Sequence, residues 1–167
     1  MSSGLSLDEA NRLDHAAFVA RFGALFEHSP WVAERAAALR PFVDVHGGLM
    51  AAVTAASDAE KLALIRAHPE LAGKVMRASA LTEASAAEQA SAGLDRLSEE
   101  EFARFHVLNS AYSERFGMPF IICVRLTDKT GILAAMAQRL GNDPATEIAA
   151  ALAQIGEIVR LRLEDLS

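Results

Sequence analysis

Helix start and stop signals recur along the whole chain, and they constrain its fold more than any other feature. Ser98 followed by Glu101 forms a capping box, in which side chains and backbone N–H groups bond reciprocally at a helix N-terminus. Gly117 is a natural stop for that helix, because glycine readily adopts the left-handed conformation of helix ends. The chain is also rich in alanine and has few runs of β-branched residues, which favours helix by intrinsic propensity. The predicted fold class is all-α.

The apolar pattern restarts often enough to predict a single-domain helical bundle of about eight helices. Asp14, Ser29 and Asp58 are the expected N-caps of three of them, and Pro30 after Ser29 suits the first helical position. The helices are expected over residues 14–27, 29–40, 45–56, 58–67, 82–93, 98–116, 130–140 and from 143 nearly to the C-terminus.

Two stretches are expected to lie outside these helices. Residues 119–125 could form a strand by composition, but no partner strand is visible elsewhere, so an extended loop is expected. Residues 1–13 are expected to form an N-terminal extension of one domain that covers residues 1–167.

Size and charge exclude several classes of protein. A chain of 167 residues with 51% hydrophobic residues can bury one sizeable core but is too short for two comfortable domains. The formal net charge is −6, so no basic excess exists to neutralise a nucleic-acid backbone or an anionic membrane surface. We therefore expect neither nucleic acid nor a membrane as a partner.

The cysteine content and the N-terminus predict a cytoplasmic protein. The single cysteine, Cys123, lies in an apolar run, where a buried reduced thiol is more common than a nucleophile. Residues 1–10 carry neither the basic nor the apolar region of a signal peptide. No apolar stretch approaches the roughly 18 residues that suggest a membrane span.

The last predicted helix contains a cation where its pattern asks for an apolar residue. Its apolar stripe is formed by Ile148, Leu152, Ile155, Val159, Leu163 and Leu166. Arg162 falls inside that stripe, whereas Arg160 points away from it beside Glu157 and suits a surface ion pair. Two interpretations of Arg162 stay open. It either faces an anionic ligand, or it has a structural partner or extends its head to water.

The helix expected over 82–93 places three polar side chains on one face. Ser85, Glu88 and Gln89 stand at i, i+3 and i+4, next to small apolar residues, so Glu88 is expected to be at least half-buried. Burial disfavours the charged form of a carboxyl group, which is the condition that a proton-transferring carboxylate needs near neutral pH. A helical glutamate that pairs with a basic partner is an equally good interpretation.

His68 is the third polar residue in an unusual place. Pro69 disfavours helical geometry in the residue before it, so the preceding helix should stop near Ala67 and leave His68 at its end. The imidazole could then face a cleft, although a single histidine is more often structural or exposed. Four other histidines compete with it: His15, His28, His46 and His106. No His, Asp or Glu pair has a recognisable metal-ligand spacing, so we expect no metal site.

Several separated motifs make the chain resemble the OHCU decarboxylase family. The resemblance covers about residues 14 to 166 and rests on the strings 26–34, 68–74, 85–95, 108–121 and 161–163, which occur in the family's order. Met118 departs from the pattern, since an aromatic residue is frequent there in the family. The resemblance implies an all-helical carboxy-lyase of urate degradation. It would convert 2-oxo-4-hydroxy-4-carboxy-5-ureidoimidazoline (OHCU) to (S)-allantoin and CO2 without a cofactor.

The same resemblance implies roles for individual residues. His68 corresponds to the catalytic histidine, Glu88 to the catalytic carboxylate and Arg162 to the arginine that holds the anionic end of the substrate. The implied substrate-binding residues are Pro69, Ser85, Gln89, Phe120, Ile121, Ile122, Cys123 and Val124, the last five through their backbone. An extended loop suits that use, because its N–H and C=O groups are not consumed by helix bonds.

Three alternatives remain from the sequence alone. The chain could be a non-catalytic helical interaction module, a metal-dependent hydrolase of small amides, or a family member that acts on a related ureido or carboxy-imidazoline substrate. The sequence does not determine the oligomeric state, but an acidic, alanine-rich helical surface is compatible with a homodimer.

Overall fold

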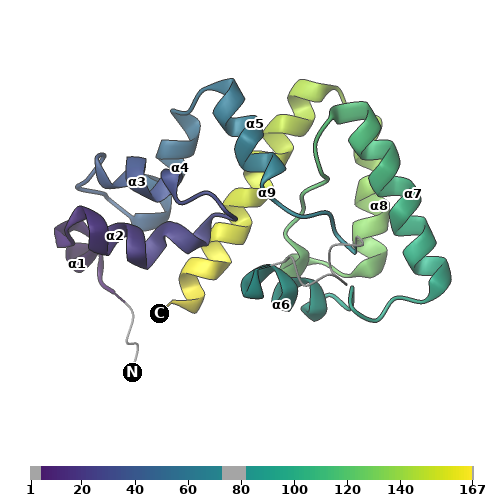
Figure 1. Ribbon diagram of the computed structural model, residues 1–167, viewed down its shortest axis with the longest axis horizontal. Coiled ribbons are helices and arrows are strands. Elements are labelled where there is room, and N and C mark those ends of the chain that lie inside the picture. Colours follow the sequence, from purple (N-terminus) through teal and green to yellow (C-terminus); the bar gives the residue numbers. More distant parts are fainter. Residues whose placement is uncertain (1–4, 73–81, 167) are drawn as a thin grey trace. The chain divides into compact units, whose positions relative to one another are not determined.

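The computed structural model describes residues 5–72 and 82–166, and within them the protein is built from helices (Figure 1). These residues contain nine α-helices and no β-strand, which confirms the all-α prediction. Two compact units are present. Unit 1 is the chain up to Ala67 together with the chain from Gly156 on, and unit 2 is His68–Ile155.

Unit 1 packs helices around a core of aromatic and aliphatic side chains. Its elements are α1 (Leu7–Arg12), α2 (His15–Phe22), the 3-10 helix η1 (Gly23–Leu25), α3 (Trp31–Ala37), α4 (Val45–Thr54), α5 (Asp58–Arg66) and the C-terminal part of α9 (Pro144–Asp165). Phe18, Leu49, Leu64 and Ile65 are fully buried in it. The expected N-terminal extension is partly helical here, since it contains α1 with its buried Ala10.

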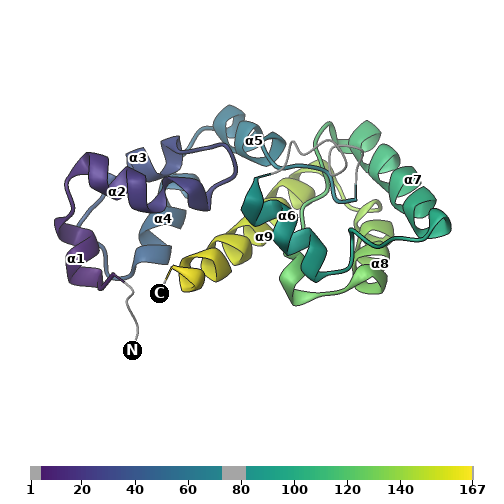
Figure 2. The same ribbon diagram turned by 60° about the horizontal axis from the view of Figure 1, so that its bottom comes forward.

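Unit 2 places α7 (Glu99–Phe116) beside α8 (Lys129–Arg139), as both ribbon views show (Figures 1 and 2). The unit also contains α6 (Glu83–Ser91), the 3-10 helix η3 (Val124–Leu126) and the N-terminal part of α9. Its fully buried side chains include Phe105, Tyr112, Phe120, Ile132 and Met136.

Helix ends were predicted well where a local hydrogen bond defines them. Asp14 caps α2, the two bonds of the Ser98 capping box begin α7, and Gly117 ends α7 with a φ of 68°. Thr82 caps α6, and Asp143 accepts a bond from the Thr146 N–H at the start of α9. These signals need only side chains within one turn, so the sequence alone displays them.

Two of the predicted N-caps were wrong. Ser29 does not cap a helix, since its hydroxyl donates to the Glu27 carbonyl at 2.8 Å and α3 starts at Trp31. Ser57 caps α5 in place of Asp58.

The predicted ends of two helices also lie too far along the chain. The helix expected over 14–27 ends at Phe22, where η1 follows it. The helix expected to reach Arg40 ends at Ala37. The Arg40 side chain folds back over this end and donates to the Ala37 carbonyl at 2.9 Å.

The buried face of α9 is rotated from the stripe that the sequence predicted. Its most buried side chains are Glu147, Ala151, Ile155, Ile158, Val159 and Arg162, while Ile148, Leu152 and Leu163 are partly exposed. The predicted stripe was drawn from apolar residues only. It therefore missed Glu147, a charged residue that is buried.

The segment that follows α7 is irregular, as expected. Residues 119–123 are neither helix nor strand, and only from Val124 does the chain turn into η3. The segment is nevertheless interior, because Phe120, Ile121 and Cys123 are all buried.

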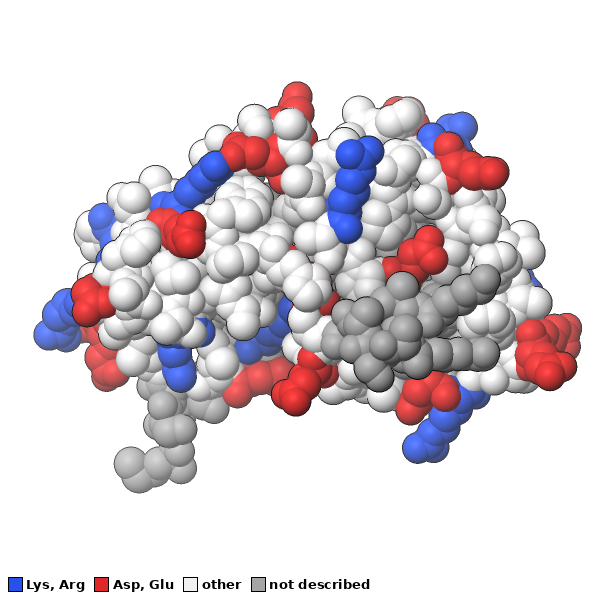
Figure 3. All heavy atoms as spheres, viewed as in Figure 1, with Lys and Arg blue, Asp and Glu red and all other residues white. Residues whose placement is uncertain are grey.

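Acidic and basic side chains are interspersed on the face seen in Figure 3, and no broad basic area lies there outside the grey atoms. Within residues 5–72 and 82–166, no helix has both the length and the apolar character of a membrane span.

The Ser98 cap should be measurable in isolation. Ser98→Ala removes the acceptor of the Glu101 N–H bond and should lower the free energy of unfolding by about 1 kcal/mol. Ser110→Ala, at an exposed position within α7, is the matched control and should cost nothing, because alanine is the better helix former. Urea titration measures both, and equal losses would contradict the assignment.

Whether the two units unfold as one domain can be tested with two natural probes. The only tryptophan, Trp31, lies in unit 1, and the only tyrosine, Tyr112, lies in unit 2. We expect coincident transitions in tryptophan fluorescence and tyrosine absorbance, since α9 supplies core residues to both units. Separate midpoints would instead show two independently unfolding domains.

Candidate functional site

His68 lies where the sequence predicted, directly after a helix end. Helix α5 ends at Arg66 with Ala67 as its C-cap, and His68 is the first residue of unit 2. Its side chain is 8% exposed, so the imidazole is buried rather than held in solvent. Pro69, which follows it, is partly exposed.

Two buried amide side chains fix the turn that follows His68. Ala72 adopts a φ of 54°, a left-handed conformation that is unfavourable for alanine and persists only when the surroundings impose it. Its N–H donates to Gln89 Oε1 at 3.0 Å. One residue earlier, the Leu71 carbonyl accepts from Asn109 Nδ2 at 2.8 Å. Helices α6 and α7 therefore hold the chain leaving His68. Gly73 and Lys74, the end of that sequence motif, lie outside the described residues.

The polar face predicted on α6 exists. Ser85 and Gln89 are 5% and 3% exposed, and Glu88, between them, is partly exposed. Because Gln89 binds the turn after His68, this face and the histidine segment belong to one assembly in unit 2. Helix α6 also packs against η3, which directly follows residues 120–123.

The backbone of residues 120–124 is held by side chains from two helices. Arg139 Nη1 of α8 donates to the Ile121 carbonyl at 2.8 Å, and Gln154 Oε1 of α9 accepts from the Cys123 N–H at 2.9 Å. The Arg139 guanidinium also lies over the Phe120 ring, 4.3 Å from its centroid. Cys123 is buried, which agrees with the structural thiol expected there.

The same Arg139 side chain also contacts a fully buried carboxylate, Glu147. It accepts hydrogen bonds from Tyr112 Oη at 2.6 Å, from Arg139 Nε at 2.8 Å and from Asn142 Nδ2 at 2.8 Å. Burial alone would raise the pKa of Glu147, but these three donors outweigh it and leave the pKa lowered. Burial, and then the bond to Glu147, raises the pKa of Tyr112. The cluster is therefore a charged Glu–Arg pair with neutral donors around it.

Arg162 belongs to unit 1 and is buried there, at 6% exposure. Its Nη1 donates to the Leu25 carbonyl at 3.3 Å and lies 3.7 Å from Glu27 Oε1, whose side chain is 2% exposed. Glu27 and the Leu25 carbonyl are therefore structural partners of the guanidinium, which is one of the two interpretations that the sequence left open. Arg160 is paired with Glu157 at 2.7 Å on the surface, as predicted.

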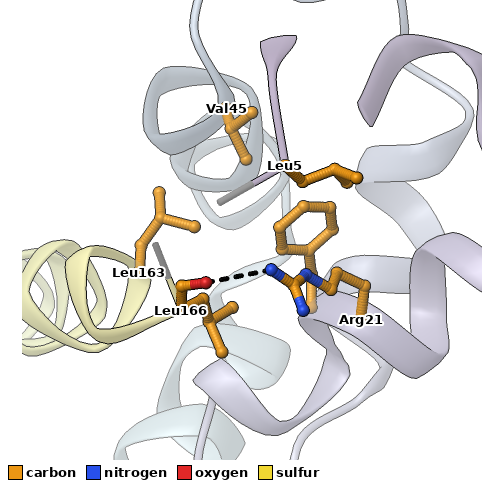
Figure 4. Close-up of a pocket in the computed structure, with 6 residues that line it drawn as sticks. Leu5, Arg21, Val45, Leu163 and Leu166 are labelled. Atoms are coloured by element: carbon orange, nitrogen blue, oxygen red, sulfur yellow. Dashed lines mark hydrogen bonds between the residues drawn. The ribbon is translucent and has the colours of Figure 1, made fainter. Parts of the chain in front are cut away.

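A hollow of about 130 Å³ in unit 1 contains none of the predicted site residues. It is lined by Leu5, Arg21, Phe22, Val45, Leu163 and Leu166 (Figure 4). Arg21 Nη2 donates to the Leu166 carbonyl at 3.0 Å across it. Among the described residues, no three His, Cys, Asp or Glu side chains are grouped closely enough to hold a metal ion.

Sequence reasoning missed Asn109, Arg139 and Glu147. Each lies on a helix where a polar residue at that spacing suits a solvated face, and only the buried partner on another element distinguishes it. One signal was available for Glu147. It shares the face of Ala151, Ile155 and Arg162 on α9, about 60° from Arg162 at 100° per residue.

Comparison with known proteins places the chain clearly. The family model described as OHCU decarboxylase matches residues 11–164. The 2-oxo-4-hydroxy-4-carboxy-5-ureidoimidazoline decarboxylase of Haloferax volcanii is 44% identical and covers 96% of this chain and 95% of its own. That of Amia calva is 39% identical, with coverages of 97% and 94%.

Two solved structures are similar in fold. One, described as (S)-allantoin synthase, has a TM-score of 0.74 and 28% identity, and the match covers 97% of this chain and 53% of that one, about half its length. The other, described as OHCU decarboxylase in the presence of (S)-allantoin, has a TM-score of 0.63, 21% identity and coverages of 81% and 89%. With its family model matched from residue 11 to residue 164, the chain belongs to the OHCU decarboxylase family.

Proposed function

We propose that this protein decarboxylates OHCU to (S)-allantoin and CO2 in urate degradation. The observation that carries the proposal is the family match over nearly the whole chain, supported by relatives of that name that align along almost their full length. The arrangement in unit 2 is compatible with it, since a buried histidine, a partly exposed glutamate and an irregular backbone segment are connected through α6.

The reaction needs no electron sink beyond the substrate itself. OHCU carries its carboxylate on a ring carbon that also bears a hydroxyl and adjoins a ring C=N. When the bond to CO2 breaks, its electron pair forms a C=C bond and the C=N electrons move to nitrogen, which takes a proton. Loss of the hydroxyl proton and protonation of the ureido-bearing carbon then give allantoin. The protein must orient the carboxylate and deliver that last proton to one face, which produces a single enantiomer.

We assign the proton chemistry to His68 and Glu88. His68 handles the hydroxyl proton or the final protonation, because an imidazole can do either near neutral pH. Glu88 destabilises the departing carboxylate or shuttles a proton. Arg162 anchors the anionic end of the molecule, a task suited to the planar guanidinium fork.

The remaining contacts are proposed from α6 and the 120–124 segment. Pro69 shapes the wall beside His68, and Ser85 offers a hydroxyl. Gln89 already uses Oε1 on the Ala72 N–H, so its Nε2 is the end that donates to the substrate.

The backbone of Phe120, Ile121, Ile122, Cys123 and Val124 supplies the other polar contacts. Within it the Cys123 N–H is engaged by Gln154, which directs the substrate toward the neighbouring groups. We further propose a cytoplasmic location and a homodimer. Sedimentation velocity would test the homodimer.

The assignment of His68 is tested by the chirality of the product. With OHCU generated freshly by urate oxidation and hydroxyisourate hydrolysis, circular dichroism should show rapid formation of optically active allantoin with the wild-type protein. His68→Ala should lower kcat by at least about 100-fold, the size of a general acid–base contribution. His106→Ala, an exposed histidine on α7, should leave the rate unchanged.

The outcomes of that experiment separate the alternatives. A slow racemic background with the wild-type protein would overturn the decarboxylase proposal. Full activity of His68→Ala beside an active wild type would remove only the role of the histidine.

Arg162 requires a test that separates substrate binding from its structural ion pair. Arg162→Lys keeps a cation near Glu27 but loses the guanidinium fork, so KM should rise about tenfold while the protein stays folded. Arg160→Lys is the control, because that arginine pairs with Glu157 on the surface, and its KM should not change. A lower Tm with an unchanged KM for Arg162→Lys would leave Arg162 with the structural role alone.

A further inference from the structure

Residues 120–123 are neither helix nor strand, yet Phe120, Ile121 and Cys123 are buried. A substrate can bind their backbone groups productively only if those groups keep fixed directions. Two side chains contact this backbone at points two residues apart: Arg139 at the Ile121 carbonyl and Gln154 at the Cys123 N–H. They come from α8 and α9, and both contacts are close to ideal hydrogen-bond length.

Arg139 is itself held on three sides. Its Nε donates to the fully buried Glu147, its Nη1 reaches the Ile121 carbonyl, and its guanidinium plane lies over the Phe120 ring. Phe120 in turn meets the Tyr112 ring edge-on at 5.3 Å, and Tyr112 donates to Glu147. The closed circuit of Glu147, Arg139, Phe120 and Tyr112 leaves the guanidinium no alternative position without leaving a buried charge uncompensated.

We propose that Arg139, oriented by Glu147, and Gln154 form a two-point clamp that positions the 120–124 backbone for substrate binding. Both are positioning residues: they act through the segment and not on the reacting atoms. The inference rests on the proposed function, since it assigns to the clamp the shape of that same site. It also gives the buried carboxylate of Glu147 a function, because that carboxylate orients Arg139.

Gln154 gives the cleanest test, because it is partly exposed and can be truncated without opening the core. Gln154→Ala removes the acceptor of the Cys123 N–H and should raise KM about tenfold while kcat changes by less than about threefold. Gln154→Glu retains an acceptor oxygen at the same position and should restore KM to near the wild-type value. If Gln154 had a structural role alone, both variants would have a lower Tm. KM and kcat would then change together, and the two variants would not differ from each other.

Arg139→Lys tests the other point of the clamp. A lysine keeps the charge beside Glu147 but cannot bond Glu147 and the Ile121 carbonyl together, so KM should again rise about tenfold. Arg115→Lys is the matched control, because Arg115 donates to the Asn142 carbonyl at 2.7 Å from the exposed side of the same unit, and its KM should stay unchanged. All assays are run well below the Tm of each variant.

The two proposals fail in different ways. If the wild-type protein produces no optically active allantoin, both the proposed function and the clamp are overturned. If the wild type is active and both Gln154→Ala and Arg139→Lys keep the wild-type KM, only the clamp is overturned. Should Arg139→Lys fail to fold, the Gln154 pair alone decides: an unchanged KM in Gln154→Ala rejects the clamp.

Discussion

The buried carboxylate of Glu147 imposes the strongest constraint on unit 2. A charge without solvent is tolerated only when it is paired and hydrogen-bonded, and here three donors from two helices and the α8–α9 turn supply the bonds. The requirement ties Tyr112 of α7 and Arg139 of α8 to the start of α9. The ion pair with Arg139 then extends the same constraint to Phe120 and Ile121, so one charge organises both the helix packing and the irregular segment.

The candidate site is built mainly from chain that lacks regular structure, and amide or guanidinium side chains replace the missing backbone bonds. Gln89 and Asn109 hold the turn after His68, and Arg139 and Gln154 hold residues 120–124. Irregular backbone keeps N–H and C=O groups available for a ligand, whereas a helix would consume them. The cost is a set of buried polar residues whose loss leaves unsatisfied groups, as well as a strained Ala72.

Arg162 has the structural partner that one of its two interpretations required. Periodicity placed it on an apolar face and left open a ligand or a structural partner, and unit 1 provides the partner in Glu27 and the Leu25 carbonyl. The structural interpretation is thus confirmed for Arg162, whereas its contact with an anionic ligand stays a prediction.

The sequence by itself determined what depends on neighbours within one or two turns. The all-α class, the Ser98 capping box, the Gly117 stop and the end of α5 before His68 are local features, and all are present. The motifs that resemble the family also pointed to the family that the comparisons established. Only the tertiary structure decided which face of α9 is buried, that Ser29 bonds Glu27 instead of capping a helix, and that Arg139 meets Ile121. The physical reason is that a polar residue is stable in the interior only beside a particular partner, and that partner is distant in sequence.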